Sequence, residues 1–178
     1  DRGGDWSSDV CSSDLEAVNA AFESDAVYWA RGMEPEYLKK MLSKSLCFGI
    51  YALPESSSEL AGKNPLNPSN VALADCSSGR SDPPQVGFAR VITDEVTFAY
   101  LTDVYVLEEH QGKGLGSWLM ECVDEEFASW PHLRRVMLMA NLKEGEAFYA
   151  KMGLSQFKQG ENGFAILNKR GKGSGMPV

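Results

Sequence analysis

The sequence has no apolar run approaching the roughly 20 residues that a membrane helix needs. Its N-terminus also lacks the charged-then-apolar order of a signal peptide. The four cysteines show no C-x-x-C spacing, and His110 and His132 are the two histidines. Scattered cysteines indicate reduced thiols rather than a disulfide frame or a zinc site. We therefore expect a protein of the cytoplasm, with the nucleus not excluded, that uses neither a membrane nor a metal ion.

Positive charge is also scarce, because 17 lysines and arginines face 25 acidic residues and the net charge is −8. A phosphate backbone needs lysine and arginine to neutralise it, so nucleic acid is a poor partner. A cationic substrate is compatible with the acidity. With 178 residues, of which 43% are hydrophobic, the chain can build one well-formed core but hardly two.

The first fifteen residues form a separate case. Residues 5–15, D-W-S-S-D-V-C-S-S-D-L, match the translation of a common sequencing-library adapter residue by residue. We therefore treat residues 1–15 as an artefactual or disordered tail and leave them out of the fold prediction. The alternative is a genuine polar N-terminal tail.

The rest of the chain alternates between helical and extended patterns. Apolar residues at helical spacing predict two helices near the N-terminus, and β-branched and aromatic runs predict strands. Helices are expected at 15–31, 34–45, 114–130 and 144–152. Strands are expected at 47–53, 85–92, 96–106 and 134–140, with a final hairpin at 155–167.

Two segments show neither helical spacing of apolar residues nor a strand-forming run. Residues 54–84 are rich in Ser, Pro, Asn and Gly, which predicts a flexible insertion, with a lid or partner-binding loop as the alternative. Residues 169–178 are polar and glycine-bearing and are predicted to be disordered. The expected organisation is thus a single α/β domain at 16–168 with an insertion at 54–84.

The strand at 96–106 leads into three alternating glycines, Gly112, Gly114 and Gly116, and then into a helix. A strand, a glycine turn and a helix N-terminus together present backbone N–H groups and the positive end of a helix dipole, which suits an anion. The spacing G-x-G-x-G differs from the G-x-G-x-x-G of dinucleotide-binding folds, and the P-loop spacing is absent. The anion is therefore not held by either of these nucleotide motifs.

The segment Gln111-Gly112-Lys113-Gly114-Leu115-Gly116 resembles the R/Q-x-x-G-x-G/A loop of the GCN5-related N-acetyltransferases, the GNAT superfamily. The preceding strand L-T-D-V-Y-V and the later segment E-A-F-Y-A-K-M-G-L, at 146–154, resemble the same family at its other landmarks. The resemblance implies an α/β fold in which a mixed, mostly antiparallel twisted sheet is flanked by helices. The family's first strand is then missing, or replaced by the adapter-like stretch.

The resemblance also implies a cofactor, acetyl-CoA, and the residues that hold it. The backbone amides of 111–116 would bind its pyrophosphate, with Lys113 adding charge, and a plain turn whose glycines relieve strain is the alternative. A Val104 amide could steady the tetrahedral oxyanion. Val104, Tyr105 and Val106 would pair through their backbone with the pantetheine arm, and the remaining expected cofactor contacts are Asn141 and Phe148. Capping at the strand end is an equal alternative for Asn141.

Two side chains are expected to carry the chemistry. Tyr149 matches the family's tyrosine near the thioester sulfur, which can protonate the departing thiolate, and an interior aromatic residue is the alternative. Asp103 is the candidate base for the amine, although strand alternation places it opposite Val104 and a structural salt bridge has even odds. Glu95 is a second choice of base.

For the acceptor we expect Tyr28, Trp29 and Arg31 after the first helix, together with Phe98 and Tyr100, because aromatic rings can hold an amine by cation–π contact. Plain packing of Trp29 has equal weight. The resemblance predicts acetyl transfer to a primary amine of a small molecule by direct attack in a ternary complex. A protein lysine or N-terminal acetyltransferase, and a non-catalytic acyl-CoA-binding regulatory module, are the alternatives. A homodimer stays open.

Overall fold

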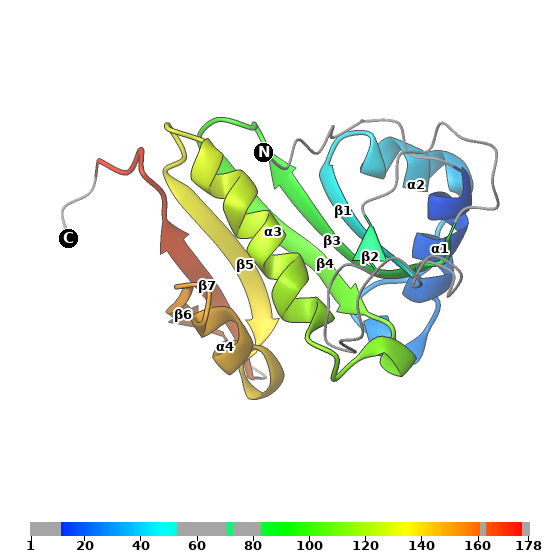
Figure 1. The fold of residues 1–178 in the computed structure, drawn as a ribbon. Coiled ribbons are helices and arrows are strands. Elements are labelled where there is room, and N and C mark those ends of the chain that lie inside the picture. The colour runs from blue at the N-terminus through cyan, green and yellow to red at the C-terminus, as the bar shows by residue number, and fades with distance from the viewer. Residues whose placement is uncertain (1–11, 53–70, 73–82, 161–162, 176–178) are drawn as a thin grey trace, which may run out of the picture. The chain divides into compact units, whose positions relative to one another are not determined.

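The computed structural model describes residues 12–52, 71–72, 83–160 and 163–175 (Figure 1). The helices are α1 (Ser12–Phe22), α2 (Pro35–Leu42), α3 (Leu115–Ser129) and α4 (Leu142–Ala150), with short 3₁₀ turns at Asp25–Val27 and Glu108–His110. The strands are β1 (Leu46–Ala52), β2 (Val71–Ala72), β3 (Gln85–Thr93), β4 (Phe98–Val106), β5 (Arg135–Asn141), β6 (Ser155–Gln159) and β7 (Phe164–Arg170). Among the described residues, the hydrogen-bonded strand order is β2-β1-β3-β4-β5-β7-β6.

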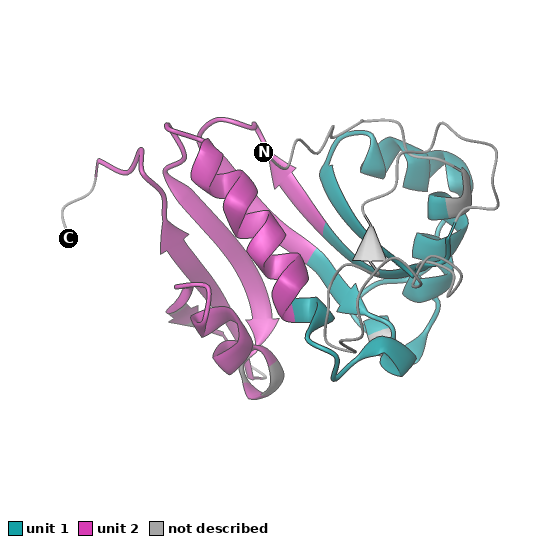
Figure 2. Ribbon diagram, in the orientation of Figure 1, with its two compact units in different colours: residues 1–89, 103–116 teal, residues 90–102, 117–178 magenta. Residues whose placement is uncertain are grey.

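The chain divides into two compact units (Figure 2). Unit 1 comprises 1–89 and 103–116, and unit 2 comprises 90–102 and 117–178. Strands β3 and β4 each contribute residues to both units.

The core of unit 1 lies where α1 and α2 cover strand residues. Apolar side chains at helical spacing, such as Val18 and Phe22 on α1 or Leu38 and Leu42 on α2, are almost fully buried, which is what an amphipathic helix requires. Strands β3 and β4 supply Phe88 and Tyr105, whose ring centroids are 5.9 Å apart. The buried cluster is Val18, Ala21, Phe22, Val27, Leu38, Leu42, Phe88 and Tyr105.

Unit 2 is built on β5. This strand pairs antiparallel with β7 along all its residues, from Arg135↔Arg170 to Asn141↔Phe164. On its other side it pairs in parallel with β4 at three positions, the last being Tyr100↔Met137. In Figure 2, α3 lies along β5. The buried face of α3 is Leu119, Met120, Val123 and Phe127.

Two predicted boundaries are wrong. The helix expected at 15–31 ends at Phe22, because Ser24 turns back on α1: its backbone N–H and its hydroxyl both donate to the Ala21 carbonyl, the hydroxyl at 2.7 Å. Serine competes for backbone groups in this way and favours helix ends over helix interiors. The helix also begins at Ser12, so its first turn lies inside the adapter-like stretch, and Asp14 there accepts a 2.7 Å bond from the Tyr51 hydroxyl.

The second wrong boundary is the start of the disordered tail, which was expected at Lys169. Lys169 and Arg170 belong to β7, and the Lys169 amine is 2.5 Å from the Asp124 carboxylate of α3. The chain continues against the end of α3, since the Lys172 amine donates to the Ala128 carbonyl at 2.8 Å. The polar composition of residues 169–178 therefore gave no sign that β7 extends to Arg170. An ion pair from Lys169 and a hydrogen bond from Lys172 to a backbone carbonyl hold this segment against α3.

The predicted insertion at 54–84 lies outside the described residues except for β2 and residues 83–84. Strand β2 pairs antiparallel with β1 through Tyr51↔Ala72 and Ala52↔Val71. In the part of the chain that the structure describes, no helix is both long and apolar enough to cross a membrane.

Candidate functional site

The glycine turn follows β4 and leads into α3, as predicted: Gly112 and Gly114 precede the helix, and Gly116 is its second residue. Gly112 and Gly114 have φ angles of 72° and 80°, in the left-handed region that side chains disfavour. A Cβ atom built on either would meet nothing within 4 Å. Both glycines are therefore required by backbone conformation and not by crowding.

Two side chains of the turn fold back on the backbone. The Gln111 amide donates to the Val106 carbonyl at 2.8 Å, and the Lys113 amine donates to the Glu109 carbonyl at 3.0 Å. Residues 111–114 are exposed. The 15-residue helix α3 starts directly after them, so backbone amides and a helix N-terminus stand at one solvent-facing turn, which is an arrangement that binds anions.

Asp103 has an unusual backbone angle within β4, the strand that precedes this turn. Its φ angle is 51°, which is uncommon for a residue other than glycine, and its side chain is buried. Strained backbone of this kind costs about 1–3 kcal/mol and is found preferentially at functional sites. This left-handed residue lies immediately before Val104, the residue expected to steady an oxyanion. Sequence reasoning missed it, although aspartate is one of the few residues that tolerate the left-handed region.

The alternation predicted for this strand is confirmed, because Leu101, Asp103 and Tyr105 are buried and their neighbours less so. The Tyr105 hydroxyl donates to Gln85 Oε1 at 3.3 Å. Burial, and then the negative charges of Asp103 and Asp14, raise the pKa of Tyr105 well above its ordinary value.

Gln85 continues this contact into a chain of polar groups. Its amide nitrogen is 3.5 Å from the Tyr51 hydroxyl, which in turn donates to Asp14 at 2.7 Å. Gln85 is itself buried. The chain thus links β4, β3, β1 and α1, and sequence patterns gave no signal for it because its successive members are 20, 34 and 37 residues apart.

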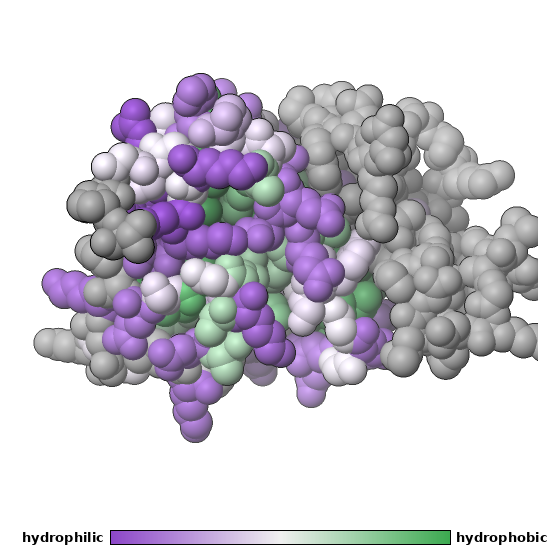
Figure 3. All heavy atoms as spheres, turned by 60° about the vertical axis from the view of Figure 1, so that its left-hand side comes forward, coloured by the Kyte–Doolittle hydropathy of each residue, from purple (hydrophilic) through white to green (hydrophobic). Residues whose placement is uncertain are grey.

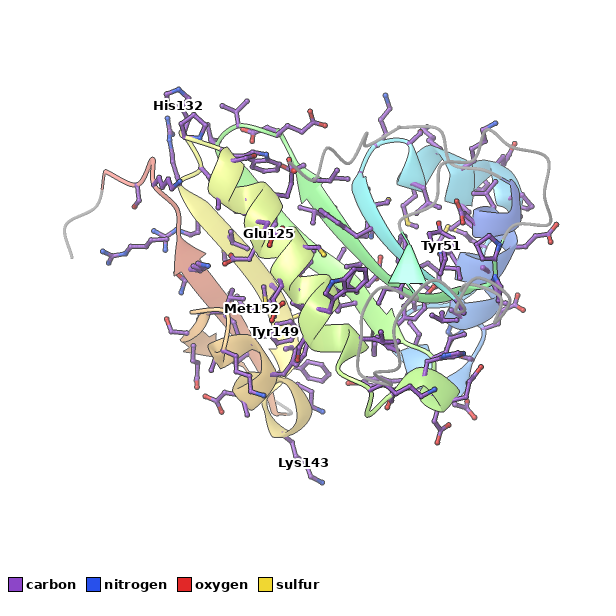
Figure 4. The ribbon with its side chains drawn as sticks, in the orientation of Figure 1. Tyr51, Glu125, His132, Lys143, Tyr149 and Met152 are labelled. Carbon is purple, nitrogen blue, oxygen red and sulfur yellow. The ribbon has the colours of Figure 1, made fainter. Side chains whose placement is uncertain are left out.

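In unit 2, Tyr149 lies on α4 as predicted. Burial raises the pKa of its phenol to about 12, and its ring is in edge contact with Phe148 at 5.0 Å. Figure 4 shows Tyr149 on the inner side of α4 and Lys143 extending away from the ribbon. Gly153, with a φ angle of 75°, ends this region as the predicted left-handed cap.

Asn141 caps α4, because its side-chain oxygen accepts from the Lys143 N–H at 3.0 Å. The capping alternative for this residue is therefore confirmed. A contact between Asn141 and a cofactor stays a prediction.

Comparison with known proteins decides the family. The model of the acetyltransferase (GNAT) domain matches residues 79–154. The Gibberella zeae protein named Putative acetyltransferase FG08082 is 38% identical over 170 residues, which cover 94% of this chain and 89% of that protein. The chain belongs to the GNAT acetyltransferase family.

Solved GNAT structures agree in fold. A protein from Xanthomonas campestris pv. campestris that is assigned to the GNAT family is 29% identical, with a TM-score of 0.53 over 83% of this chain and 79% of that one. An aminoglycoside 6'-N-acetyltransferase solved with coenzyme A is 14% identical, with a TM-score of 0.56 over 90% and 92%. The predicted α/β GNAT fold, a mixed sheet flanked by helices, is confirmed.

The aromatic residues expected at the acceptor site of this GNAT protein lie at the surface. Tyr28 and Trp29 are 57% and 46% exposed and in edge contact at 5.1 Å, and Arg31 is exposed near them in sequence. Exposure of this size disfavours the packing alternative for Trp29. These three residues belong to unit 1.

Phe98 and Tyr100 belong to unit 2, where they pair across the β4–β5 ladder with Arg135 and Met137. Phe98 is 39% exposed and Met139, farther along β5, is 62% exposed. Figure 3 shows hydrophobic residues on one face of unit 2, with hydrophilic residues around them.

Glu95, the second choice of base, is exposed in the turn between β3 and β4, with a φ angle of 60°. It lies before the first residue of β4, whereas Val104, Tyr105 and Val106 close that strand. The roles of Asp103 and Glu95 as the base both stay predictions.

Proposed function

We propose that this GNAT protein transfers an acetyl group from acetyl-CoA to a primary amine of a small molecule, by direct attack in a ternary complex. The observation that carries the proposal is the glycine turn: amides held by Gly112 and Gly114 in left-handed conformations, opening directly onto the N-terminus of α3. Such a turn can bind a pyrophosphate, and the exposed position of 111–114 leaves its amides accessible.

The residues present fit coenzyme A in a second respect. The Gln111 side chain is bonded to the Val106 carbonyl, which fixes the turn relative to the end of β4. A turn fixed before binding loses less conformational entropy when an anion arrives. When bound, acetyl-CoA supplies the activated thioester.

The chain's own residues would act at three points. Asp103 is the candidate to accept a proton from the amine, directly or through water. The Val104 N–H, next to the left-handed Asp103, would donate to the oxyanion that forms during attack. Tyr149 would protonate the departing thiolate, and its pKa of about 12 keeps the phenol protonated at neutral pH.

The exposed Tyr28–Trp29 pair supports a cationic acceptor, because a ring face within about 6 Å attracts an ammonium group. A net charge of −5 remains when the four aspartates and one arginine of residues 1–15 are set aside, and this negative charge also attracts a cation. The small-molecule class is proposed over a protein acceptor on the basis of this compact two-ring surface.

The testing experiment is acetyl-CoA-dependent thiol release against amino sugars, polyamines, arylalkylamines, amino acids and a lysine peptide, run beside Tyr149→Phe. Turnover with one small-amine class that falls in the variant supports the proposal. Turnover with the peptide alone would replace the small molecule by a protein acceptor. Tight acetyl-CoA binding without any turnover would indicate a non-catalytic acyl-CoA-binding module.

A further inference from the structure

Helix α4 has a glycine in its interior. Gly145 is the fourth of nine residues, and glycine is less favourable than every other residue except proline at such a position. Helices this short have little stability of their own, so an unfavourable residue in the middle needs a compensating contact.

The space beside Gly145 is taken by the Tyr149 ring. A Cβ atom at position 145 would lie 3.2 Å from Tyr149 Cε2, 3.4 Å from its Cδ2 and 3.1 Å from the Ala140 Cβ. Residues four apart on a helix are neighbours, and long helical side chains lean toward the N-terminus. The ring therefore lies back over the glycine, at a distance that a methyl group would not tolerate without displacement.

Other contacts within unit 2 hold the Tyr149 ring and its backbone. The Phe148 ring is in edge contact with it, with an interplanar angle of 74°. The Tyr149 carbonyl accepts bonds from the N–H groups of Met152 and Leu154, at 3.0 and 3.3 Å, which holds the backbone in place. With the backbone held, ring position depends on the space that residue 145 leaves.

We propose that Gly145 is a positioning residue for the Tyr149 phenol: the missing side chain lets the ring lie where it can act as the proton donor. This inference rests on the proposed function. A displacement of a few tenths of an ångström is enough to matter, because catalysis is sensitive to misplacement on the ångström scale.

The activity test is a double-mutant cycle of Gly145→Ala and Tyr149→Phe, with kcat and KM measured for the best amine of the panel. Gly145→Ala alone should lower kcat about five- to tenfold with KM unchanged. In the Tyr149→Phe background it should change kcat less than twofold, since no phenol remains to be positioned. Equal loss in both backgrounds, or no loss in either, overturns the inference.

A second double-mutant cycle, with the melting temperature as its readout, tests the contact between Gly145 and the Tyr149 ring without any measurement of activity. Gly145→Ala should raise the melting temperature more in a Tyr149→Ala background than in the natural chain, because alanine favours the helix once the ring is gone. Equal shifts in the two backgrounds contradict the contact. Gly175→Ala, where a Cβ would meet nothing within 4 Å, is the matched control and should leave kcat unchanged.

The two failures are distinguishable. If Tyr149→Phe itself leaves kcat unchanged, the proposed role of Tyr149 as proton donor is wrong, and the stability cycle still reports whether Gly145 holds the ring. If Tyr149→Phe lowers kcat while Gly145→Ala acts equally in both backgrounds, only the positioning role is wrong.

Discussion

The glycine turn of unit 1 and helix α4 of unit 2 use glycine for different physical reasons. Gly112 and Gly114 have φ angles of 72° and 80° in open space, so any side chain there is strained whatever its size. Gly145 of α4 has no positive φ but is crowded by the Tyr149 ring. The turn therefore offers backbone amides and is sensitive to conformation, whereas α4 offers a side chain and is sensitive to volume.

The largest expected effect tests the side-chain half of this comparison. Tyr149→Phe removes the phenolic proton and keeps the ring, so kcat should fall about 10²-fold while KM for acetyl-CoA changes little. Steady-state kinetics at pH 7 measure it. Because the pKa of the phenol is raised to about 12, from 10.0, the natural protein should show no loss of kcat from tyrosine ionisation up to pH 10. An alkaline loss below that pH that disappears in the variant would contradict the assignment.

The backbone half is tested by Gly114→Ala. Placing a side chain at a φ of 80° costs about 1–2 kcal/mol. If the turn relaxes to avoid this strain, the amides leave their positions and KM for acetyl-CoA should rise about tenfold with a smaller change in kcat. Isothermal titration with coenzyme A gives the same difference without turnover.

The matched variant for that experiment is Lys113→Ala, which leaves the backbone unchanged. Its amine is already bonded to the Glu109 carbonyl, so binding should weaken less than in Gly114→Ala. A larger effect at Lys113 than at Gly114 would show that charge, and not the amide geometry, dominates the turn.

A smaller effect is expected at the polar chain of unit 1. Tyr105→Phe removes the hydroxyl that donates to Gln85 and should destabilise the fold by about 1 kcal/mol, measured by urea unfolding. Tyr37→Phe, at a side chain that is 57% exposed, is the control and should change stability by less than about 0.5 kcal/mol. Equal losses of unfolding free energy at both positions would mean that the hydrogen bond from Tyr105 to Gln85 contributes nothing specific to stability.

The smallest effect concerns the turn between β3 and β4 in unit 2. Asp94 accepts bonds from the N–H groups of Val96, Thr97 and Phe98 and from the Thr97 hydroxyl, and the hydroxyl bond is the main reason that its pKa lies below the ordinary 3.8. A carboxylate with a lowered pKa in the folded state stabilises that state above its unfolded pKa, and this contribution is lost as pH falls through the folded value.

Asp94→Asn should therefore lower the melting temperature slightly at pH 7 and leave it nearly unchanged below the folded pKa of Asp94. Thermal unfolding of both proteins across the acidic range measures the difference. A gap that stays constant with pH would show that the carboxylate charge plays no part.

Much of this protein could be predicted from local sequence. The strands at β1, β3, β4 and β5 fall within two residues of their predicted ends, because β-branched and aromatic runs favour extension whatever surrounds them. The glycine turn and the register of Tyr149 against Gly153 were also predicted, since both depend on spacing along one short segment.

Tertiary structure decided the rest. The left-handed φ angle of Asp103, in a strand dense in β-forming residues, is held by its surroundings and opposes local preference. The Tyr105–Gln85–Tyr51–Asp14 chain joins four elements, and neither the extension of β7 to Arg170 nor the early end of α1 follows from composition. Periodicity and turn chemistry act between neighbours in sequence, whereas a strained backbone angle or a buried hydrogen bond is stabilised by groups that only folding brings together.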